Sequence, residues 1–231
     1  MKKFTPYLLV AALAVPFLFT TGSCTRTTGA NPTDSSTVYY QDLMVIYDKD
    51  VKTTNATALF RTTNENGYIH QLTDHENLNI NRTLAPFDPS DRSYYWNSNK
   101  LVNVEFILTK NSGYQFQNTV YLSDTSDVDF PSVFPTSINK SSGITVDWDG
   151  RVLDSNEKLL LIVEDLTHLP VYKNLVGNQW TFNSTDLLNL TPGTVKIKLE
   201  RFRILPLQNP DSNSSGRRQI IVRTSRNISL I

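Results

Sequence analysis

Residues 101–109 read LVNVEFILT, and this stretch indicates the fold class of the whole chain. Its apolar residues recur at every second position, which is the pattern of a β-strand with one buried face. Asn111, Ser112 and Gly113 follow as a turn, and the alternation resumes in residues 114–122 (YQFQNTVYL). The two segments together predict a β-hairpin. The expected inward set is Val102, Val104, Phe106 and Leu108, against Asn103, Glu105, Ile107 and Thr109 outward.

Segments of the same kind precede this hairpin. They are short, they carry Val, Ile, Tyr and Phe, and polar turns separate them every 8 to 12 residues or so, which is typical of a β-sandwich. The segments are residues 38–47 (VYYQDLMVIY), 56–62 (ATALFRT), 68–72 (YIHQL) and 78–80 (LNI). We therefore expect residues 38–125 to form a first β-sandwich.

The second half repeats the style. Residues 158–164 (KLLLIVE) are a continuous apolar run whose length fits a strand buried on both faces. Residues 184–190 (STDLLNL) fit either one helical turn or a polar step. The other expected strands are 143–148, 180–184, 194–202, 219–224 and 228–231. The prediction is an all-β fold with two tandem β-sandwiches of immunoglobulin or fibronectin type III style, the second spanning residues 126–231.

The N-terminus carries a targeting pattern. Lys2 and Lys3 open the chain, residues 7–19 are apolar apart from Pro16, and residues 20–23 are small or hydroxylated. A basic start, a short apolar run and a small-residue zone are typical of a secretory signal. The run is too short to span a bilayer, which takes roughly 20 residues. We predict a signal peptide at residues 1–23.

Cys24 is the single cysteine of the chain and follows the signal directly. Gly22 and Ser23 resemble the lipobox of bacterial lipoproteins, although Thr21 stands where that motif usually has leucine. The resemblance implies cleavage before Cys24 and lipidation of its sulfur. The alternative is a secreted protein with one odd thiol, which could pair only between molecules. Residues 24–37 then form a flexible polar tether.

Charge and cysteine count exclude several functions. The signal carries two of the 22 basic residues and none of the 22 acidic ones, so the mature chain has a small net negative charge. Nucleic-acid binding needs a concentrated basic surface, so we expect no nucleic-acid partner. With a single cysteine, no disulfide forms within a monomer, so a hydrophobic core must stabilise the fold.

The second half resembles a β-sandwich module of uncharacterised Bacteroidota outer-membrane lipoproteins. The residues that carry the resemblance are Trp148, the aliphatic run 159–163, Asp186-Leu187, Pro192-Gly193 and Arg201. Residues 56–122 resemble the immunoglobulin-like partner domain of similar proteins. The resemblance implies a fold and an outer-membrane location, and it carries no catalytic residues.

Candidate catalytic and metal-binding residues are few. The chain has no G-x-S-x-G or H-E-x-x-H motif and no glycine-rich phosphate loop. The histidines His70, His75 and His168 read as surface residues more readily than as metal ligands. Clustered acids fit solvated loops, a weak Ca²⁺ site or, least readily, paired-carboxylate hydrolysis; they are Asp124, Asp127, Asp129, Asp147 and Asp149. We expect no metal, no cofactor beyond the lipid and no catalytic site.

Tyr94, Tyr95 and Trp96 form the most suggestive cluster. They lie in a polar stretch, residues 92–99 (RSYYWNSN), where a core does not obviously claim them. Exposed aromatics stack on sugars or anchor protein interfaces. The alternative is that they alternate into the core as one short strand. Trp148 and Trp180 lie in alternating segments and are expected in the core.

These observations favour a non-enzymatic lipoprotein of the outer membrane with a binding or structural role. Its expected partners are the membrane, through the lipid on Cys24, and a protein or a glycan. A glycan-binding surface lipoprotein of a polysaccharide-uptake system is the alternative, and a hydrolase is a third. Thr25 is not the aspartate that retains enterobacterial lipoproteins at the inner membrane, and the tether lacks an acidic export run, so either membrane face remains open.

Overall fold

The computed structural model describes residues 37–231 apart from residue 74 and residues 176–178 and 212–214. Within these residues the regular secondary structure is almost entirely β-strand, so the predicted all-β fold class is confirmed. The helical elements are η1 (Leu122–Asp124) and α1 (Ser184–Leu187). The single helical turn expected as one reading of residues 184–190 is therefore present.

The strands are mostly short in the first half and include two long ones at the end of the chain. Those of the first half are β1 (Tyr39–Asp48), β2 (Thr53–Thr62), β3 (Ile69–His70), β4 (Asn77–Ile80), β5 (Thr83–Leu84), β6 (Phe87–Asp88), β7 (Ser93–Ser98), β8 (Val104–Thr109) and β9 (Gln115–Val120). Those of the second half are β10 (Val128–Asp129), β11 (Ser137–Ile138), β12 (Ile144–Asp147), β13 (Asp149–Gly150), β14 (Glu157–Glu164), β15 (Val171–Leu175), β16 (Gln179–Phe182), β17 (Gly193–Pro206) and β18 (Gly216–Leu230).

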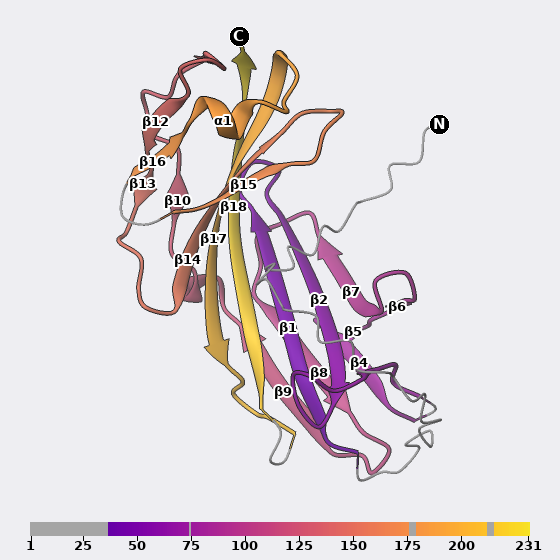
Figure 1. Ribbon diagram of the computed structural model, residues 1–231. Helices are drawn as coiled ribbons and strands as arrows, with labels where there is room; N and C mark the ends of the chain where they lie inside the picture. The colour runs from indigo at the N-terminus through magenta and orange to yellow at the C-terminus, as the bar shows by residue number, and fades with distance from the viewer. Residues whose placement is uncertain (1–36, 74, 176–178, 212–214) are drawn as a thin grey trace.

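One large sheet runs through the whole molecule (Figure 1). Its strand order is β15-β14-β17-β18-β1-β2-β7-β6, with β11 also paired to β18 and β3 to β2. Strand β1 pairs in parallel with β18, from Gln41 opposite Gly216 to Asp48 opposite Arg223. The first described strand thus lies beside the last, and the sheet joins the two halves of the chain.

The first core lies between the large sheet and a second, four-stranded sheet of order β5-β4-β8-β9. In Figure 1 this second sheet lies behind β1 and β2. Val104, Phe106 and Leu108 of β8 are buried in the core, as the alternation predicts. The core also includes Tyr39, Leu43, Val45, Tyr47, Ala56, Ala58, Phe60, Leu78, Ile80, Tyr94, Val120 and Ile220.

The predicted start of the strand at residue 101 is wrong, because β8 begins at Val104. The backbone N–H of Val102 donates to the Thr54 hydroxyl (3.2 Å), and that hydroxyl donates to the Lys100 carbonyl (2.8 Å). A side chain of β2 therefore takes up the backbone hydrogen bonding that a neighbouring strand would provide.

The second core lies between the other end of the large sheet and a layer made of β10-β13, β12-β16 and α1. Leu159, Leu161 and Val163 of β14 face this core, and Ile162 is buried on the opposite face of the same strand. Trp148 and Trp180 are both buried here, as expected. The core also includes Val128, Phe130, Ile138, Phe182, Leu187, Leu190, Val195, Ile197, Leu199, Val222, Ile228 and Leu230.

A buried ion pair fastens the loops around the second core. Arg201 of β17 donates to the carboxylate of Glu157 (2.6 Å), and their side chains are 1% and 0% exposed. The same guanidinium lies 5.5 Å from the centroid of the Trp148 ring. It also donates to the backbone carbonyls of Asp127, Arg151 and Val152.

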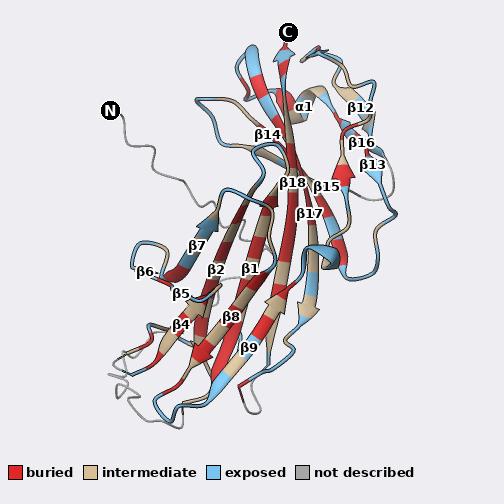
Figure 2. Cartoon of the chain, turned by 180° about the vertical axis from the view of Figure 1, so that it is seen from behind, coloured by how far each residue is buried: buried red, intermediate tan, exposed pale blue. Residues whose placement is uncertain are grey.

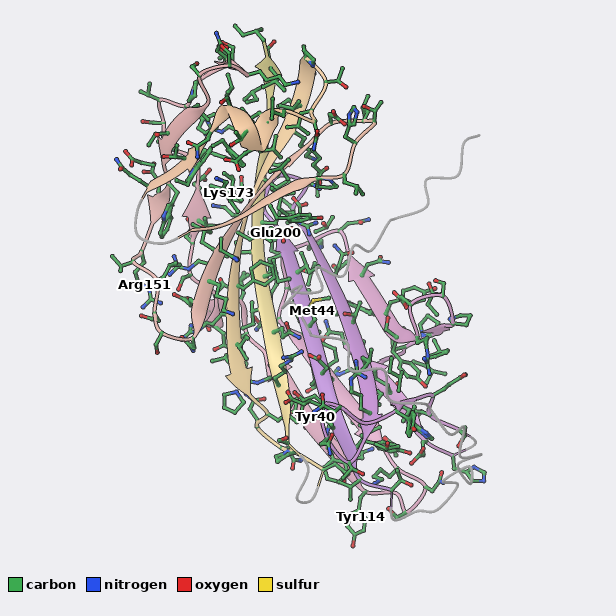
Figure 3. All side chains as sticks on the ribbon, viewed as in Figure 1. Tyr40, Met44, Tyr114, Arg151, Lys173 and Glu200 are labelled. Atoms are coloured by element: carbon green, nitrogen blue, oxygen red, sulfur yellow. The ribbon has the colours of Figure 1, made fainter. Side chains whose placement is uncertain are left out.

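Strand β18 contributes to both cores from one of its faces. Ile220 lies in the first core, whereas Val222, Ile228 and Leu230 lie in the second, and all four are an even number of residues apart. Figure 2 shows these buried positions along the strand. The two cores therefore lie end to end on the same side of one sheet. The other face of the sheet carries Tyr40, Met44 and Glu200 (Figure 3).

Candidate functional site

A polar groove lies on the outer face of the four-stranded sheet, with a volume of about 360 Å³. This is near the lower end of the range for small-molecule sites, roughly 300–1,000 Å³. Its lining comes from the β4–β5 turn, from the start of β8, from β9 and from the residue after β9. The lining residues are Asn81, Arg82, Asn103, Glu105, Gln117, Thr119 and Tyr121.

The β8–β9 pairing positions the floor of the groove. Glu105 pairs with Thr119, and Ile107 pairs with Gln117, in an antiparallel ladder. Because neighbouring residues of a strand point to opposite faces, burying Val104 and Val120 turns Glu105 and Thr119 outward. The alternation that builds the first core thus also sets out a row of polar side chains on the outside.

The β4–β5 turn forms one wall. Asn81 and Arg82 have φ values of 47° and 63°, the left-handed conformation that a two-residue hairpin of the primed type needs at both positions. Asn tolerates this region, whereas Arg is disfavoured there by about 1–2 kcal/mol. The side chain of Asn81 donates to the Asn103 carbonyl (3.0 Å) and accepts from the Glu105 N–H (2.9 Å). These two bonds fix the turn against the start of β8.

The hydrogen bonding of the groove leaves polar atoms facing outward. Gln117 Nε2 donates to Glu105 Oε1 at 2.6 Å. The Leu122 N–H donates to Asn103 Oδ1 at 2.7 Å. Over the described residues, Arg82 has neither an ion-pair nor a side-chain hydrogen-bond partner, and it is exposed. One cation and one carboxylate lie among the lining residues, so the formal charge of the groove is near zero.

The groove offers binding chemistry more than catalytic chemistry. Its amide, carboxylate, guanidinium and hydroxyl groups supply both donors and acceptors. Tyr121 adds a ring that is 44% exposed. Glycoside hydrolysis by the common mechanisms uses two carboxyl groups, and Glu105 is the single carboxylate of the lining.

The three predicted aromatic residues do not share a surface. Tyr94 is 6% exposed, its ring packs against Phe60 and Phe87, and its hydroxyl accepts from the Leu72 N–H (2.8 Å). Burial raises the pKa of the Tyr94 hydroxyl.

Trp96 is half-buried and packs on the first core, whereas Tyr95 is 43% exposed on the opposite face of β7. This arrangement matches the alternative given above, in which the three residues form one short strand whose side chains alternate into the core. Ligand binding at Tyr95 stays a prediction.

The histidines have different surroundings. His70 stacks on Tyr39, with ring centroids 5.0 Å apart, and burial lowers the pKa of its imidazole. His75 is exposed. His168 donates to Asp165 (2.8 Å), a carboxylate whose pKa is held low by the Thr191 N–H and by other nearby donors. No group of three or more acidic, histidine or cysteine side chains could hold a metal ion within the described part of the chain.

Two of the clustered acids form ion pairs with one lysine. Lys49 bridges Asp127 (2.6 Å) and Asp129 (3.2 Å). Asp149 is exposed and lies opposite Asp129 in the β10–β13 pair. A cation therefore already occupies the position between two of the carboxylates that were candidates for Ca²⁺ or catalysis.

The predicted lipidation site, Cys24, lies outside the described residues, as do the predicted signal and residues 24–36 of the tether. None of the helices described from residue 37 onward is long and apolar enough to cross a membrane.

The groove was missed in the sequence. The local signal for it is the polar outward set of the hairpin, Asn103, Glu105, Gln117 and Thr119. Arg82 and Tyr121 carry no local signal, since the turn of one and the position of the other depend on tertiary structure.

Comparison with known proteins identifies no family for the chain. No described protein family matches it, and no curated protein does. Among solved structures, the chain is similar to the fibronectin(III)-like modules of Clostridium thermocellum CbhA. The two share 8% identity, with 81% of this chain and 94% of the other covered and a TM-score of 0.22.

Proposed function

We propose that this chain is a non-enzymatic binding protein of the cell envelope, lipidated at Cys24 and held at the outer membrane. The polar groove on the four-stranded sheet is its ligand site. The signal pattern of residues 1–24 supports the location, in keeping with the resemblance to Bacteroidota lipoproteins. The groove carries the binding half of the proposal, because it gathers outward-facing polar groups and an exposed tyrosine on a hydrogen-bonded sheet.

The anchor is tested by cell fractionation. Full-length protein is expressed with an alkyne-tagged fatty acid, and the wild type is compared with Cys24→Ala and with Thr25→Ala as the matched control. We expect lipid label and membrane association for the wild type and Thr25→Ala. Cys24→Ala should lose both, because stable anchoring needs acyl chains on that sulfur. Label that persists in Cys24→Ala contradicts the anchor.

The binding role is tested by hydrogen–deuterium exchange of the mature protein, with and without an envelope extract of the source organism. A ligand in the groove should slow exchange at the β4–β5 turn and at the open end of the β8–β9 hairpin, where residues 81–82, 103–105 and 117–121 line it. Residues 111–114, at the far tip of the same hairpin, serve as the internal control. Equal exchange with and without extract at the groove contradicts the role.

A further inference from the structure

We infer that the groove binds a neutral saccharide, with the Tyr121 ring beneath the apolar face of one sugar and with Arg82, Glu105 and Gln117 bonded to its hydroxyls. This inference rests on the proposed function and names the ligand class for the same site. Four observations carry it: the donor and acceptor set, the charge balance, the exposed tyrosine and the hydrogen bonds that hold the backbone of the lining.

The polar atoms match a polyol. A sugar hydroxyl donates one hydrogen bond and accepts others, so a run of adjacent hydroxyls needs acceptors and donors side by side. Glu105 supplies acceptors, the Arg82 guanidinium supplies donors, and Gln117 supplies both. The 2.6 Å bond from Gln117 to Glu105 uses one amide proton and one carboxylate lone pair. It leaves the amide oxygen, the second amide proton and most of the carboxylate for a ligand.

The charge balance favours a neutral ligand. An anionic sugar would approach Arg82 but would also meet the Glu105 carboxylate on the floor of the same groove. A cationic ligand would meet the converse problem at Arg82. A neutral saccharide meets neither, and it accepts charge-assisted hydrogen bonds from one group while donating them to the other.

Tyr121 supplies the flat apolar surface that one face of a sugar ring needs. It directly follows β9 and is 44% exposed beside the polar floor. Tyrosine is suited to such a role because its ring offers a large apolar contact area, loses little side-chain entropy on binding, and keeps its hydroxyl in contact with water. The ring lies at the end of a row of outward-facing polar side chains and is not part of the core, so it is available to contact a ligand.

The backbone that carries the lining residues is held in place by hydrogen bonds within the protein. Glu105 and Gln117 lie on paired strands, and Asn81 ties the turn that carries Arg82 to the beginning of β8 through two hydrogen bonds. A preorganised site loses little entropy on binding. Arg82 also adopts a left-handed conformation that Gly or Asn would occupy at lower cost.

The test uses an array of neutral, uronic-acid and amino-sugar oligosaccharides, followed by calorimetry of the mature protein with the best neutral binder. Tyr121→Ala should weaken binding by about 2- to 10-fold, the effect of one aromatic contact. Gln117→Ala should weaken it by a similar factor, for one neutral hydrogen bond. The matched controls are Tyr114→Ala, labelled in Figure 3, and Gln115→Ala, both near the turn of the same hairpin; both should bind like the wild type.

Arg82→Gly separates a binding role from a structural one. It removes a guanidinium and should weaken binding by about 10- to 100-fold, for charged hydrogen bonds. Because glycine accepts the left-handed φ of this turn, the thermal midpoint should hold or rise. Lost binding together with a marked fall in the midpoint would mean that Arg82 acts through the fold, and would overturn its assignment as a contact.

Several results would overturn the inference. They are no neutral saccharide bound in the millimolar range or tighter, a clear preference for uronic acids, Tyr121→Ala matching Tyr114→Ala, or loss of binding on Tyr95→Ala instead. Its failure is distinct from failure of the proposed function. Protection of the groove by envelope extract that survives periodate oxidation of the extract keeps the binding role and rejects the saccharide.

Discussion

Replacing Glu157 by Gln should destabilise the protein strongly, although the change preserves the shape of the side chain. The variant leaves the Arg201 cation buried without its carboxylate, at a site where the two side chains are 1% and 0% exposed. Removing one partner of a buried pair costs about 3–5 kcal/mol. Three backbone carbonyls still accept from the guanidinium, so we expect the lower end, about 3 kcal/mol.

Thermal unfolding followed by tryptophan fluorescence measures this effect, because the Trp148 ring lies beside Arg201. At roughly 2–4 °C per kcal/mol for a chain of this size, the midpoint should fall by about 6–12 °C. Lys198→Ala is the matched control. Lys198 lies on the same strand and pairs with Glu164 in a partly exposed ion pair, where the expected cost is below about 1 kcal/mol.

The combined variant Glu157→Leu with Arg201→Met tests the reasoning itself. Replacing a whole buried pair by apolar residues is often neutral or stabilising, but here it also removes the donor to three backbone carbonyls, so the midpoint should recover part of the loss. A Glu157→Gln midpoint that falls no further than that of Lys198→Ala would refute the claim that the pair fastens the second core.

Three further predictions concern the stability of the fold. Burial raises the pKa of Glu157, but hydrogen bonds from Arg201 and from the backbone outweigh it, so the folded pKa lies below the unfolded one. The stability contributed by Glu157 is therefore complete above about pH 5 and is lost as the pH falls through the folded pKa. Urea titrations at several pH values should show that the difference in unfolding free energy between the wild type and Glu157→Gln shrinks in acid. Gly150→Ala should lower the midpoint in calorimetry, because Gly150 has a φ of +151° and a Cβ there would lie 2.5 Å from a carbon of the Trp148 indole. Gly113→Ala is the control: a Cβ there meets nothing within 4 Å, so only the φ of +82° disfavours alanine and the midpoint should fall less. Leu161→Ala should cost about 2–5 kcal/mol in urea unfolding as a core truncation, against less than about 0.5 kcal/mol for the exposed Leu188→Ala, and equal effects would contradict the assigned core.

The fold class could be predicted because its determinants are local. The alternation of Val104, Phe106 and Leu108 reports a half-buried strand without reference to any other segment. The run that contains Leu161 reports a buried strand in the same way. Polar turns between such segments then predict a sheet protein.

The strand order could not be predicted from the same signals. Strand β1 pairs with β18 across most of the chain, Val45 opposite Ile220, and neither strand carries a mark of its partner. The continuity of the large sheet across both cores follows from that pairing. Local alternation does not predict this pairing, because any strand with the same alternation could pair with β1 equally well.

The candidate site shows the same division. Glu105 and Gln117 were predictable as outward residues, while their convergence with Arg82 depends on the β4–β5 turn lying against the start of β8. Tyr94 shows why such a choice needs the fold. The sequence left exposure and burial both open for Tyr94, and strand pairing with β2 turns its ring into the first core.

The length of β18 fixes the distance between the two ends of the large sheet. Its 15 residues, at about 3.3 Å each, span about 50 Å. Its first residue lies beside Gln41, close to where the described chain begins, and its last lies in the second core. The strand continues without a break between the two cores, so it fixes the distance between the second core and Gln41, near the start of the described chain. A deletion within this strand would remove the wall of both cores at once, and the two halves should not be obtainable as separate folded pieces.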